Sequence, residues 1–516
     1  MTTLTPIEEE LFANRLTGIA REMGEMLARA ALSTNVKERR DFSCAVLDGA
    51  GRLVVNAPHI PVHLGALGVC VRAVSDHVDW QPGDVVITNH PAFGGSHLPD
   101  VTVITPVFAP GTEAPFAFAA SRAHHAEIGG IRPGSMPSAA RCLEEEGVVL
   151  APFKLVEGGV ARWGALRERL VSARHSSRNP EENLADAAAA VAANRRGVEA
   201  LLALRDAHGS ERLDAALLAV RERARLLAGR ALASREGLHV RVEDALDDGW
   251  PLAVDLRVEG GRLAIDFTGT GGVHPGNLNA TPAIVHSVVL YVLRLMLGED
   301  VPLNEGIMEL VSVRLPSDSL LDPDFTREPA PAVVGGNVET SQRLADLLVR
   351  GLRLQAGSQA TMNNVLFGDA RFGYYETIAG GAGASVSAHG ASAVHTHMTN
   401  TKITDPEVIE HRYPVLLREF SIRRGSGGAG AHRGGDGARR VYEFLRPVSV
   451  SVLTQRRAAG PPGIDGGSPG SPGRQWIERA SGEVLVLGSS GDADAKAGER
   501  LIIETPGGGG WGTPPA

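Results

Sequence analysis

Glycine is the residue that most constrains how this chain can fold. The sequence of 516 residues contains 62 glycines but only 4% aromatic residues. Glycine adopts backbone conformations that other residues avoid, so it marks tight turns and breaks in regular structure. The sequence therefore predicts short elements joined by sharp turns. Hydrophobic residues at 43% and charged residues at 22% place the chain among ordinary globular proteins.

The N-terminal part predicts helices mixed with short strands. Thr5 and Pro6, followed by three glutamates, form a helix start, and we expect this helix to run to about Ser33. Strands and one further helix follow. The strands are predicted at 41–48, 52–56, 83–89, 101–108 and 116–120, and the helix at 64–78. Several of these strands end near polar residues, which predicts a shared site at the strand ends.

The rest of the chain predicts a helical hairpin and two further lobes. Residues 183–235 are rich in alanine, leucine and arginine at helical spacing, and such a hairpin packs either on the core or against another subunit. We predict a mixed α/β (α+β) fold with mixed sheets. Its parts are a metal-site α/β lobe at 1–182, the hairpin at 183–235, a second α/β lobe at 236–415 and a β-rich lobe at 416–516. The glycine-rich segment 507–512 has no periodicity and is predicted to be a loose tail or a clamp on a partner.

Composition excludes several classes of protein. The formal charge of -9 is spread without a long single-sign block, so nucleic acid is a poor partner. The most apolar run, 283–297, contains His286 and Arg294 and is too short to span a bilayer, so we expect no membrane insertion. The three cysteines form no Cys-x-x-Cys motif, and the N-terminus lacks a secretory pattern. Both features predict a protein of the reducing cytoplasm.

A group of histidines and one aspartate predicts a metal site. His97 and Asp100 lie three residues apart in a loop that contains two glycines, and the pair His124-His125 ends an apolar strand. Imidazole and carboxylate groups from separate strand ends bind divalent ions well. Because adjacent side chains of a strand point in opposite directions, one of His124 and His125 is the expected ligand. The other would be a proton donor, a partner of a ligand or a structural hydrogen-bonding group.

Other polar residues are candidates for substrate contact or proton transfer. His59 and His63 flank a short turn and could face the same cavity; the alternative is polar contacts within a loop. His395 and His397 are two apart in a predicted strand and so share one face, which suits either substrate contact or an interface. Glu127 follows the histidine pair and is a candidate general base, or else a solvated loop residue. The Gly335-Gly336-Asn337 turn could offer backbone N–H groups to an oxyanion or a phosphate, although glycine pairs more often serve sharp turns.

The motifs together resemble the hydantoinase B/oxoprolinase family over nearly the whole chain. The resemblance rests on Glu38-Arg-Arg-Asp-Phe-Ser-Cys44, His59-Ile-Pro-Val-His63, Gly94-Gly-Ser-His-Leu-Pro-Asp100, Ser121-Arg-Ala-His-His-Ala-Glu-Ile-Gly-Gly130, Gly335-Gly-Asn-Val-Glu-Thr-Ser-Gln342 and His395-Thr-His-Met-Thr-Asn-Thr401. Two positions depart from the family pattern, because His90 and His389 stand where an aspartate is usual.

The resemblance implies a metal-bearing subunit that works with a hydantoinase A-type partner in a hetero-oligomer. By motif match, Asp41, His97, Asp100 and His124 would bind a divalent ion, which would be Zn, Mn or Fe. The partner would use ATP to phosphorylate the substrate. This chain contains no Gly-x-x-x-x-Gly-Lys-Ser/Thr sequence, which agrees with ATP being handled elsewhere.

Three functions fit this sequence. The favoured one is ring opening of a cyclic amide or imide, such as a hydantoin, oxoproline or a related lactam, with His125 or Glu127 moving protons. The second is ATP-dependent carboxylation of a ketone, in which the metal would stabilise an enolate. The third is a non-catalytic scaffold. Metal content and alanine substitutions at His97 or Asp100 distinguish the third from the other two.

Overall fold

The structure is a computed structural model that describes residues 4–57, 60–297 and 303–514. The predicted first helix is present as α1 (Pro6–Ala30), and Thr5 and Glu8 form the reciprocal hydrogen bonds of a capping box at its start. The other helices are α2 (Thr34–Lys37), α3 (Ala66–Ser75), α4 (Leu143–Glu146), α5 (Trp163–Ser172), α6 (Pro180–His208), α7 (Ser210–Ala233), α8 (Pro282–Leu297), α9 (Ser341–Gly351) and α10 (Pro406–Arg412).

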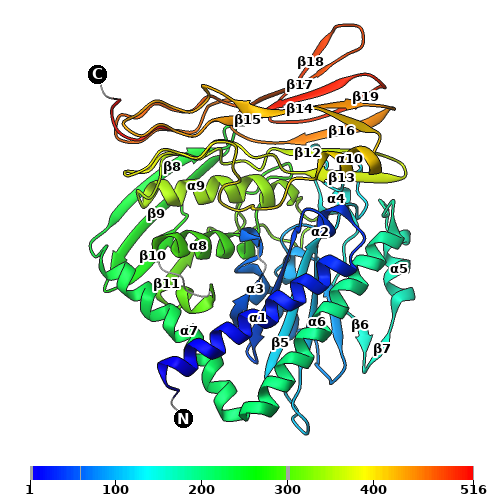
Figure 1. The fold of residues 1–516 in the computed structure, drawn as a ribbon, viewed down its shortest axis with the longest axis vertical. Coiled ribbons are helices and arrows are strands. Elements are labelled where there is room, and N and C mark those ends of the chain that lie inside the picture. Colours follow the sequence, from blue (N-terminus) through cyan, green and yellow to red (C-terminus); the bar gives the residue numbers. More distant parts are fainter. Residues whose placement is uncertain (1–3, 58–59, 298–302, 515–516) are drawn as a thin grey trace.

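A seven-stranded antiparallel sheet forms the centre of the N-terminal part. Its strand order is β2-β1-β5-β4-β3-β6-β7. The strands are β1 (Phe42–Asp48), β2 (Leu53–Asn56), β3 (Val85–Thr88), β4 (Asp100–Val107), β5 (Ala117–His124), β6 (Phe153–Glu157) and β7 (Val160–Ala161). Helices cover both faces: α1 and α6 pack on one face and α3 on the other (Figure 1). Strands β1, β4 and β5 are consequently buried along their whole length.

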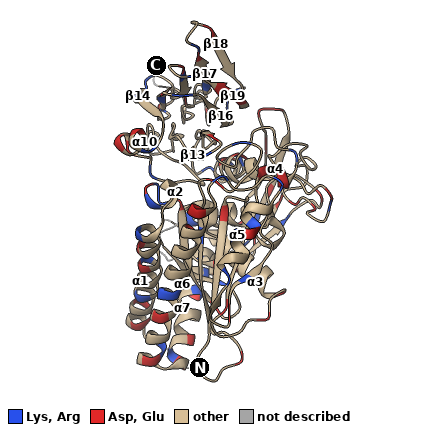
Figure 2. Cartoon of the chain, turned by 90° about the vertical axis from the view of Figure 1, so that its right-hand side faces the viewer, with Lys and Arg blue, Asp and Glu red and all other residues tan. Residues whose placement is uncertain are grey.

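The predicted helical hairpin is formed by α6 and α7. Helix α6 packs against α1, β4 and β5, so the hairpin lies on the core. Figure 2 shows acidic and basic residues intermixed along α1, α6 and α7 rather than gathered by sign. Among the described helices, none has a stretch long and apolar enough to cross a bilayer.

Three further sheets complete the fold. The first has the order β11-β10-β9-β8 and is mixed, because β10 and β11 are parallel; its strands are β8 (His239–Ala245), β9 (Pro251–Glu259), β10 (Arg262–Asp266) and β11 (Val311–Arg314). The second has the order β13-β12-β16-β19, with β12 (Asn364–Asp369), β13 (Phe372–Glu376), β16 (Val448–Leu453) and β19 (Ser490–Ala495). The third has the order β14-β15-β20-β17-β18, with β14 (Val415–Arg423), β15 (Gly437–Phe444), β17 (Arg474–Glu478), β18 (Val484–Leu487) and β20 (Arg500–Glu504).

The last two sheets enclose a common apolar core and stack above α8 and α9 in Figure 1. The mixed α/β fold with a β-rich C-terminal region is therefore confirmed. Strands β12 and β13 lie before residue 415, and β12 pairs with β13 on one side and with β16, which lies after residue 415, on the other. The four-part division of the chain stays a prediction.

The glycine-rich segment near the C-terminus is buried, so the prediction of a loose tail is wrong. Gly508, Gly509 and Gly510 donate their N–H groups in turn to Gly435 O, Gly357 O and Ser468 O, at 2.9, 2.7 and 2.9 Å. Three successive residues thus bond to three different segments of the chain. A Cβ on Gly508 would lie 1.9 Å from Ala382 O, so no larger residue fits there. We call the extended segments 356–360, 380–384, 390–394, 426–437, 460–472 and 505–512 the glycine bundle.

Candidate metal centre

The loop before β4 positions His97. The side chain of Asn89 donates to Leu98 O at 2.8 Å, and Gly95 donates its N–H to His90 O at 3.2 Å, so both ends of the loop are tied together. A Cβ on Gly95 would lie 2.6 Å from Asn89 O, which explains the glycine. The loop ends at Asp100, the first residue of β4.

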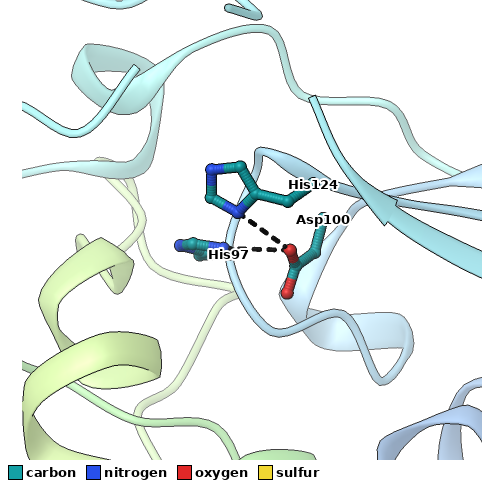
Figure 3. Close-up of side chains that lie close together, drawn as sticks. All are labelled: His97, Asp100 and His124. Carbon is teal, nitrogen blue, oxygen red and sulfur yellow. Dashed lines mark hydrogen bonds and ion pairs between the residues drawn. The ribbon is translucent and has the colours of Figure 1, made fainter. Parts of the chain in front are cut away.

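The strand register brings Asp100 and His124 together. Strands β4 and β5 are antiparallel, and Asp100 pairs directly with His124 across them. Asp100 Oδ1 lies 3.1 Å from His97 Nε2 and 3.2 Å from His124 Nδ1. Figure 3 shows the three side chains pointing toward one another. Each side chain is at most 3% exposed, and one ligand atom from each lies within 4.8 Å of the others. We call these three residues the metal cluster.

The second carboxylate oxygen of Asp100 is also held. Ser96 Oγ donates to Asp100 Oδ2 at 2.7 Å, and His63 Nε2 lies 3.3 Å from the same oxygen. Burial alone would raise the pKa of Asp100, but the charges of His97 and His63 and the hydrogen bond from His124 hold its pKa well below the ordinary value. Burial lowers the pKa of His124, so this imidazole is neutral near pH 7.

The residues of the metal cluster fit a divalent ion. Zn²⁺ and similar ions contact nitrogen and oxygen ligands at about 2.0–2.2 Å, which places neighbouring ligand atoms about 2.8–3.6 Å apart in octahedral or tetrahedral geometry. The two distances from Asp100 Oδ1 fall in that interval. His97 Nδ1 and His124 Nε2 are buried without a hydrogen-bond partner in the described part of the chain. Two imidazoles and one carboxylate are also the ligand types that Zn, Mn and Fe share.

Asp41, the fourth predicted ligand, lies beside the metal cluster. Its backbone O accepts a hydrogen bond from His124 N at 3.0 Å, and its side chain is 5% exposed. Among the described residues, the group whose ligand atoms converge does not include Asp41. Its carboxylate would have to rotate to bind the same ion, and Asp41 stays a predicted ligand.

His125 and Glu127 point into the surrounding structure. His125 Nδ1 lies 3.0 Å from Asn183 Nδ2 on α6, whereas His124 faces Asp100, so the two neighbouring histidines diverge as expected. Burial lowers the pKa of His125. Glu127 accepts hydrogen bonds from Arg178 and from the N–H groups of Gly129 and Gly134, which ties down its own loop. Burial raises the pKa of Glu127 despite the Arg178 charge.

The four histidines predicted to contact substrate differ in their surroundings. His63 contacts Asp100, and His59 lies outside the described residues. The strand predicted around His395 and His397 is wrong: both lie in a loop, and His397 has a left-handed backbone conformation with φ 55°. An isolated bridge at Val394 is too short to make the alternating pattern of a strand. His395 and His397 line a cavity of about 1330 Å³, and burial together with Arg39 lowers the pKa of His395 to about 4.

His90 and His389, which stand where the family pattern has an aspartate, each accept a hydrogen bond from the backbone. His90 Nδ1 accepts from Ala92 N at 3.1 Å and caps a short 3-10 helix, Pro91–Phe93. His389 Nδ1 accepts from Arg433 N at 2.8 Å in the glycine bundle. Neither belongs to the metal cluster among the described residues. An imidazole nitrogen thus takes the acceptor role that an aspartate oxygen fills in a turn.

Sequence reasoning missed three residues around the metal cluster. Ser96 contacts Asp100, and the ring of Tyr375 stacks on that of His124, with centroids 4.6 Å apart. Asn337 Nδ2 lies 3.0 Å from His97 Nε2. The motif containing Asn337 and its neighbouring glycines was visible in the sequence, but its closeness to His97 was not.

Comparison with known proteins gives a match at the level of the family. A sequence model described as hydantoinase B/oxoprolinase matches residues 5–514. The chain is 44% identical to 5-oxoprolinase 1 of Arabidopsis thaliana, and the match covers 98% of this chain and 42% of that protein. The chain thus spans about two fifths of the length of this curated relative.

Two solved structures have a similar fold. One is the ATP-dependent caprolactamase of Pseudomonas jessenii, with a TM-score of 0.89 and 25% identity over 99% of this chain and 92% of that one. The other is acetone carboxylase, with a TM-score of 0.83 and 18% identity over 98% of this chain and 76% of that one; this second likeness shows the fold alone.

Proposed function

Since the chain belongs to the hydantoinase B/oxoprolinase family, we propose that it is the metal-bearing part of an ATP-dependent hydrolase that opens a cyclic amide or imide ring. The substrate would be a hydantoin, oxoproline or a related lactam. The observation that carries this proposal is the buried metal cluster, because a resident catalytic ion needs converging ligands of this kind. An amide carbonyl is a poor electrophile, so ring opening needs activation of its oxygen.

We propose that activation by ATP takes place on a hydantoinase A-type partner. The chain spans about two fifths of the length of the 5-oxoprolinase of Arabidopsis thaliana, which leaves room in that relative for a second functional part. This chain contains no phosphate-binding Gly-x-x-x-x-Gly-Lys-Ser/Thr sequence, which also supports binding of ATP by the partner. The assembly would be a hetero-oligomer.

Each residue of the metal cluster has a proposed task. A divalent ion bound there, Zn, Mn or Fe, would supply a Lewis acid for the reacting oxygen. Asp100, kept ionised by its neighbours, provides the negative charge of the site, and His97 and His124 provide the nitrogens. Ser96 and His63 hold the second carboxylate oxygen of Asp100 and so fix its orientation. Asp41 is proposed as a fourth ligand after a change of rotamer.

Proton transfer is proposed for His125 and Glu127. The hydrogen bond that Asn183 donates to His125 Nδ1 leaves the imidazole proton on Nε2, from which it can be donated. Glu127 could accept a proton only after its bonds to Arg178 and the loop open. Substrate contact is proposed for His59, His63, His395 and His397, and the cavity beside the last two supports this for them. That cavity is not lined by the metal cluster.

The test is reconstitution with a candidate A-type partner. We expect the assembled complex to hydrolyse ATP together with opening of a hydantoin or lactam ring, and this chain alone to show negligible ring opening. Replacing His97 or Asp100 by alanine should lower ring opening at least about 100-fold, as loss of a metal ligand does. Glu144→Gln, an exposed change, is the matched control.

Three results would contradict the proposal. They are ring opening without ATP by this chain alone, full activity of His97→Ala and Asp100→Ala, or absence of stoichiometric metal in the purified protein. Incubation with labelled bicarbonate and acetone or acetophenone tests the carboxylase alternative. Label fixed in the product would show that the complex carboxylates a ketone.

A further inference from the structure

Asn337 lies in a π-helical turn, Gly336–Thr340, that leads directly into α9. Its side chain is 3% exposed, and its Nδ2 lies 3.0 Å from His97 Nε2. Its Oδ1 is buried without a hydrogen-bond partner in the described part of the chain. Isolated π turns within helices often occur at functional sites, because they redirect one side chain.

The backbone around Asn337 is closely fixed. Gly335 and Gly336 both donate their N–H groups to Asn277 O, at 2.8 and 3.1 Å. A Cβ on Gly336 would lie 1.8 Å from Asn279 O, so a side chain there would force the turn away. Asn337 is therefore held at His97 by the fold and is not a surface amide that happens to touch it.

The contacts of His97 Nε2 conflict in the present orientation of the Asn337 amide. Asp100 Oδ1 at 3.1 Å is an acceptor and needs a proton on Nε2, whereas Asn337 Nδ2 at 3.0 Å is a donor and needs a lone pair there. One nitrogen does not satisfy both. A half-turn of the terminal amide exchanges Nδ2 and Oδ1 at nearly the same positions. Asn337 Oδ1 and Asp100 Oδ1 then both lie within 3.1 Å of His97 Nε2, so three electron-pair donors can share either the Nε2 proton or a cation.

The spacing of these atoms matches a coordination shell. The amide atom lies 3.0 Å from His97 Nε2, within the about 2.8–3.6 Å expected between neighbouring ligands of one ion. The same interval contains the distances from Asp100 Oδ1 to both histidines.

We propose that Asn337 is a protein ligand of the metal ion and binds it through Oδ1. This inference rests on the proposed metal function of the cluster and extends it to a residue 240 positions beyond His97 in the chain. An uncharged amide oxygen is a hard ligand, so it favours Mn²⁺ or Fe²⁺ relative to Zn²⁺.

Metal affinity, measured apart from catalysis, tests this inference. Protein stripped with EDTA is titrated with Mn²⁺ and with Co²⁺ by calorimetry, and the Co²⁺ absorption spectrum is recorded. The variants are Asn337→Ala and Asn337→Asp. The matched control is Asn183→Ala, because Asn183 also touches a buried histidine at 3.0 Å, but that histidine lies outside the metal cluster.

We expect wild type and Asn183→Ala to bind with equal affinity and Asn337→Ala to bind at least about 10-fold more weakly. Asn337→Asp should keep or exceed the wild-type affinity, because a carboxylate oxygen replaces the amide oxygen, and its Co²⁺ spectrum should change. Wild-type affinity in Asn337→Ala would overturn the inference while leaving the proposed function intact. Equal loss in Asn337→Ala and Asn337→Asp would also overturn it, since it would mean that the amide N–H matters. A wild type that binds no metal would overturn both proposals.

Discussion

Glu146 is a buried carboxyl group that supports the metal centre from a distance. Its Oε1 accepts the N–H groups of Val333 and Val334, just before the π-helical turn that carries Asn337. Its Oε2 is buried without a partner among the described residues. Burial outweighs the two backbone hydrogen bonds and raises the pKa of Glu146 to about 8. The carboxyl group is therefore largely protonated near pH 7 in the folded protein.

This residue should make stability depend on pH. Between its ordinary pKa of 4.5 and about 8, the folded state keeps a proton that the unfolded state releases. The contribution of Glu146 to stability is therefore largest below pH 4.5 and falls as pH rises, by up to about 1.4 kcal/mol per pH unit, until about pH 8. The glutamine in Glu146→Gln does not titrate. The apparent Tm of this variant minus that of the wild type should therefore increase between about pH 6 and pH 8.

Thermal unfolding across that pH range measures the effect. Glu144→Gln, at an exposed position two residues away, should follow the wild-type profile. Parallel profiles for Glu146→Gln and wild type would show that Glu146 is ionised in the folded protein.

At the scale of single residues, sequence reasoning was strongest where ligands are close along the chain. His97 and Asp100 share one loop, and His124 ends the strand that pairs with β4. Asn337 reaches the site from a different part of the fold, and only the packing of Gly335 and Gly336 against Asn277 and Asn279 brings it there. Nothing in the local pattern of residues encodes such an approach.

The element that sequence reasoning did not find is the glycine bundle. Its segments have neither the period of a helix nor that of a strand, so hydrophobic patterning gives no signal. The order comes from main-chain hydrogen bonds between segments far apart in the sequence, and glycine permits the close approach that these bonds need. The strand predicted at His395 and His397 is wrong because, among the described residues, the only pairing beside this loop is the isolated bridge between Gly380 and Val394.

Substitution within the glycine bundle should be costly. In Gly508→Ala the new Cβ would lie 1.9 Å from Ala382 O, and the neighbouring segments are backbone that cannot give way cheaply. We expect a destabilisation of about 2–4 kcal/mol, which for a chain of this length lowers the apparent Tm by roughly 2–4 °C.

Gly488→Ala is the matched control in the same part of the chain. Its Cβ would meet Ser490 O at 3.8 Å, an ordinary contact, and its backbone is not left-handed. This variant should melt at the wild-type temperature by calorimetry. A Gly508→Ala protein as stable as Gly488→Ala would refute the tight packing of the bundle.

At the scale of the whole molecule, the metal centre joins parts that are distant in the sequence. The metal cluster comes from the seven-stranded sheet, and Asn337 and Tyr375 approach it from the turn before α9 and from β13. Arg39 extends these contacts, because its guanidinium lies over the Tyr375 ring and donates to Tyr375 O. An ion bound among these groups would hold the N-terminal sheet to the sheets above it.

Metal binding should therefore stabilise the entire fold. A ligand that binds only the folded state adds about 2.7 kcal/mol when its concentration is 100-fold above Kd. We expect EDTA-stripped protein to melt at a lower temperature than the same protein with saturating Mn²⁺ in a calorimeter.

His97→Ala and Asp100→Ala should lose this response to Mn²⁺, and Asn183→Ala should keep it. Identical melting of stripped and Mn²⁺-saturated wild type would argue against an ion at this site.

The position of the glycine bundle in the chain has a consequence for synthesis of the protein. Segment 505–512 hydrogen-bonds to segments that begin as early as residue 356, and it bonds to them on several sides. While residues 356–472 leave the ribosome, their main-chain groups facing this segment have only water as partner. Completion of the bundle must then wait until translation has passed residue 512. A product truncated before residue 505 would expose these groups to chaperones and proteases.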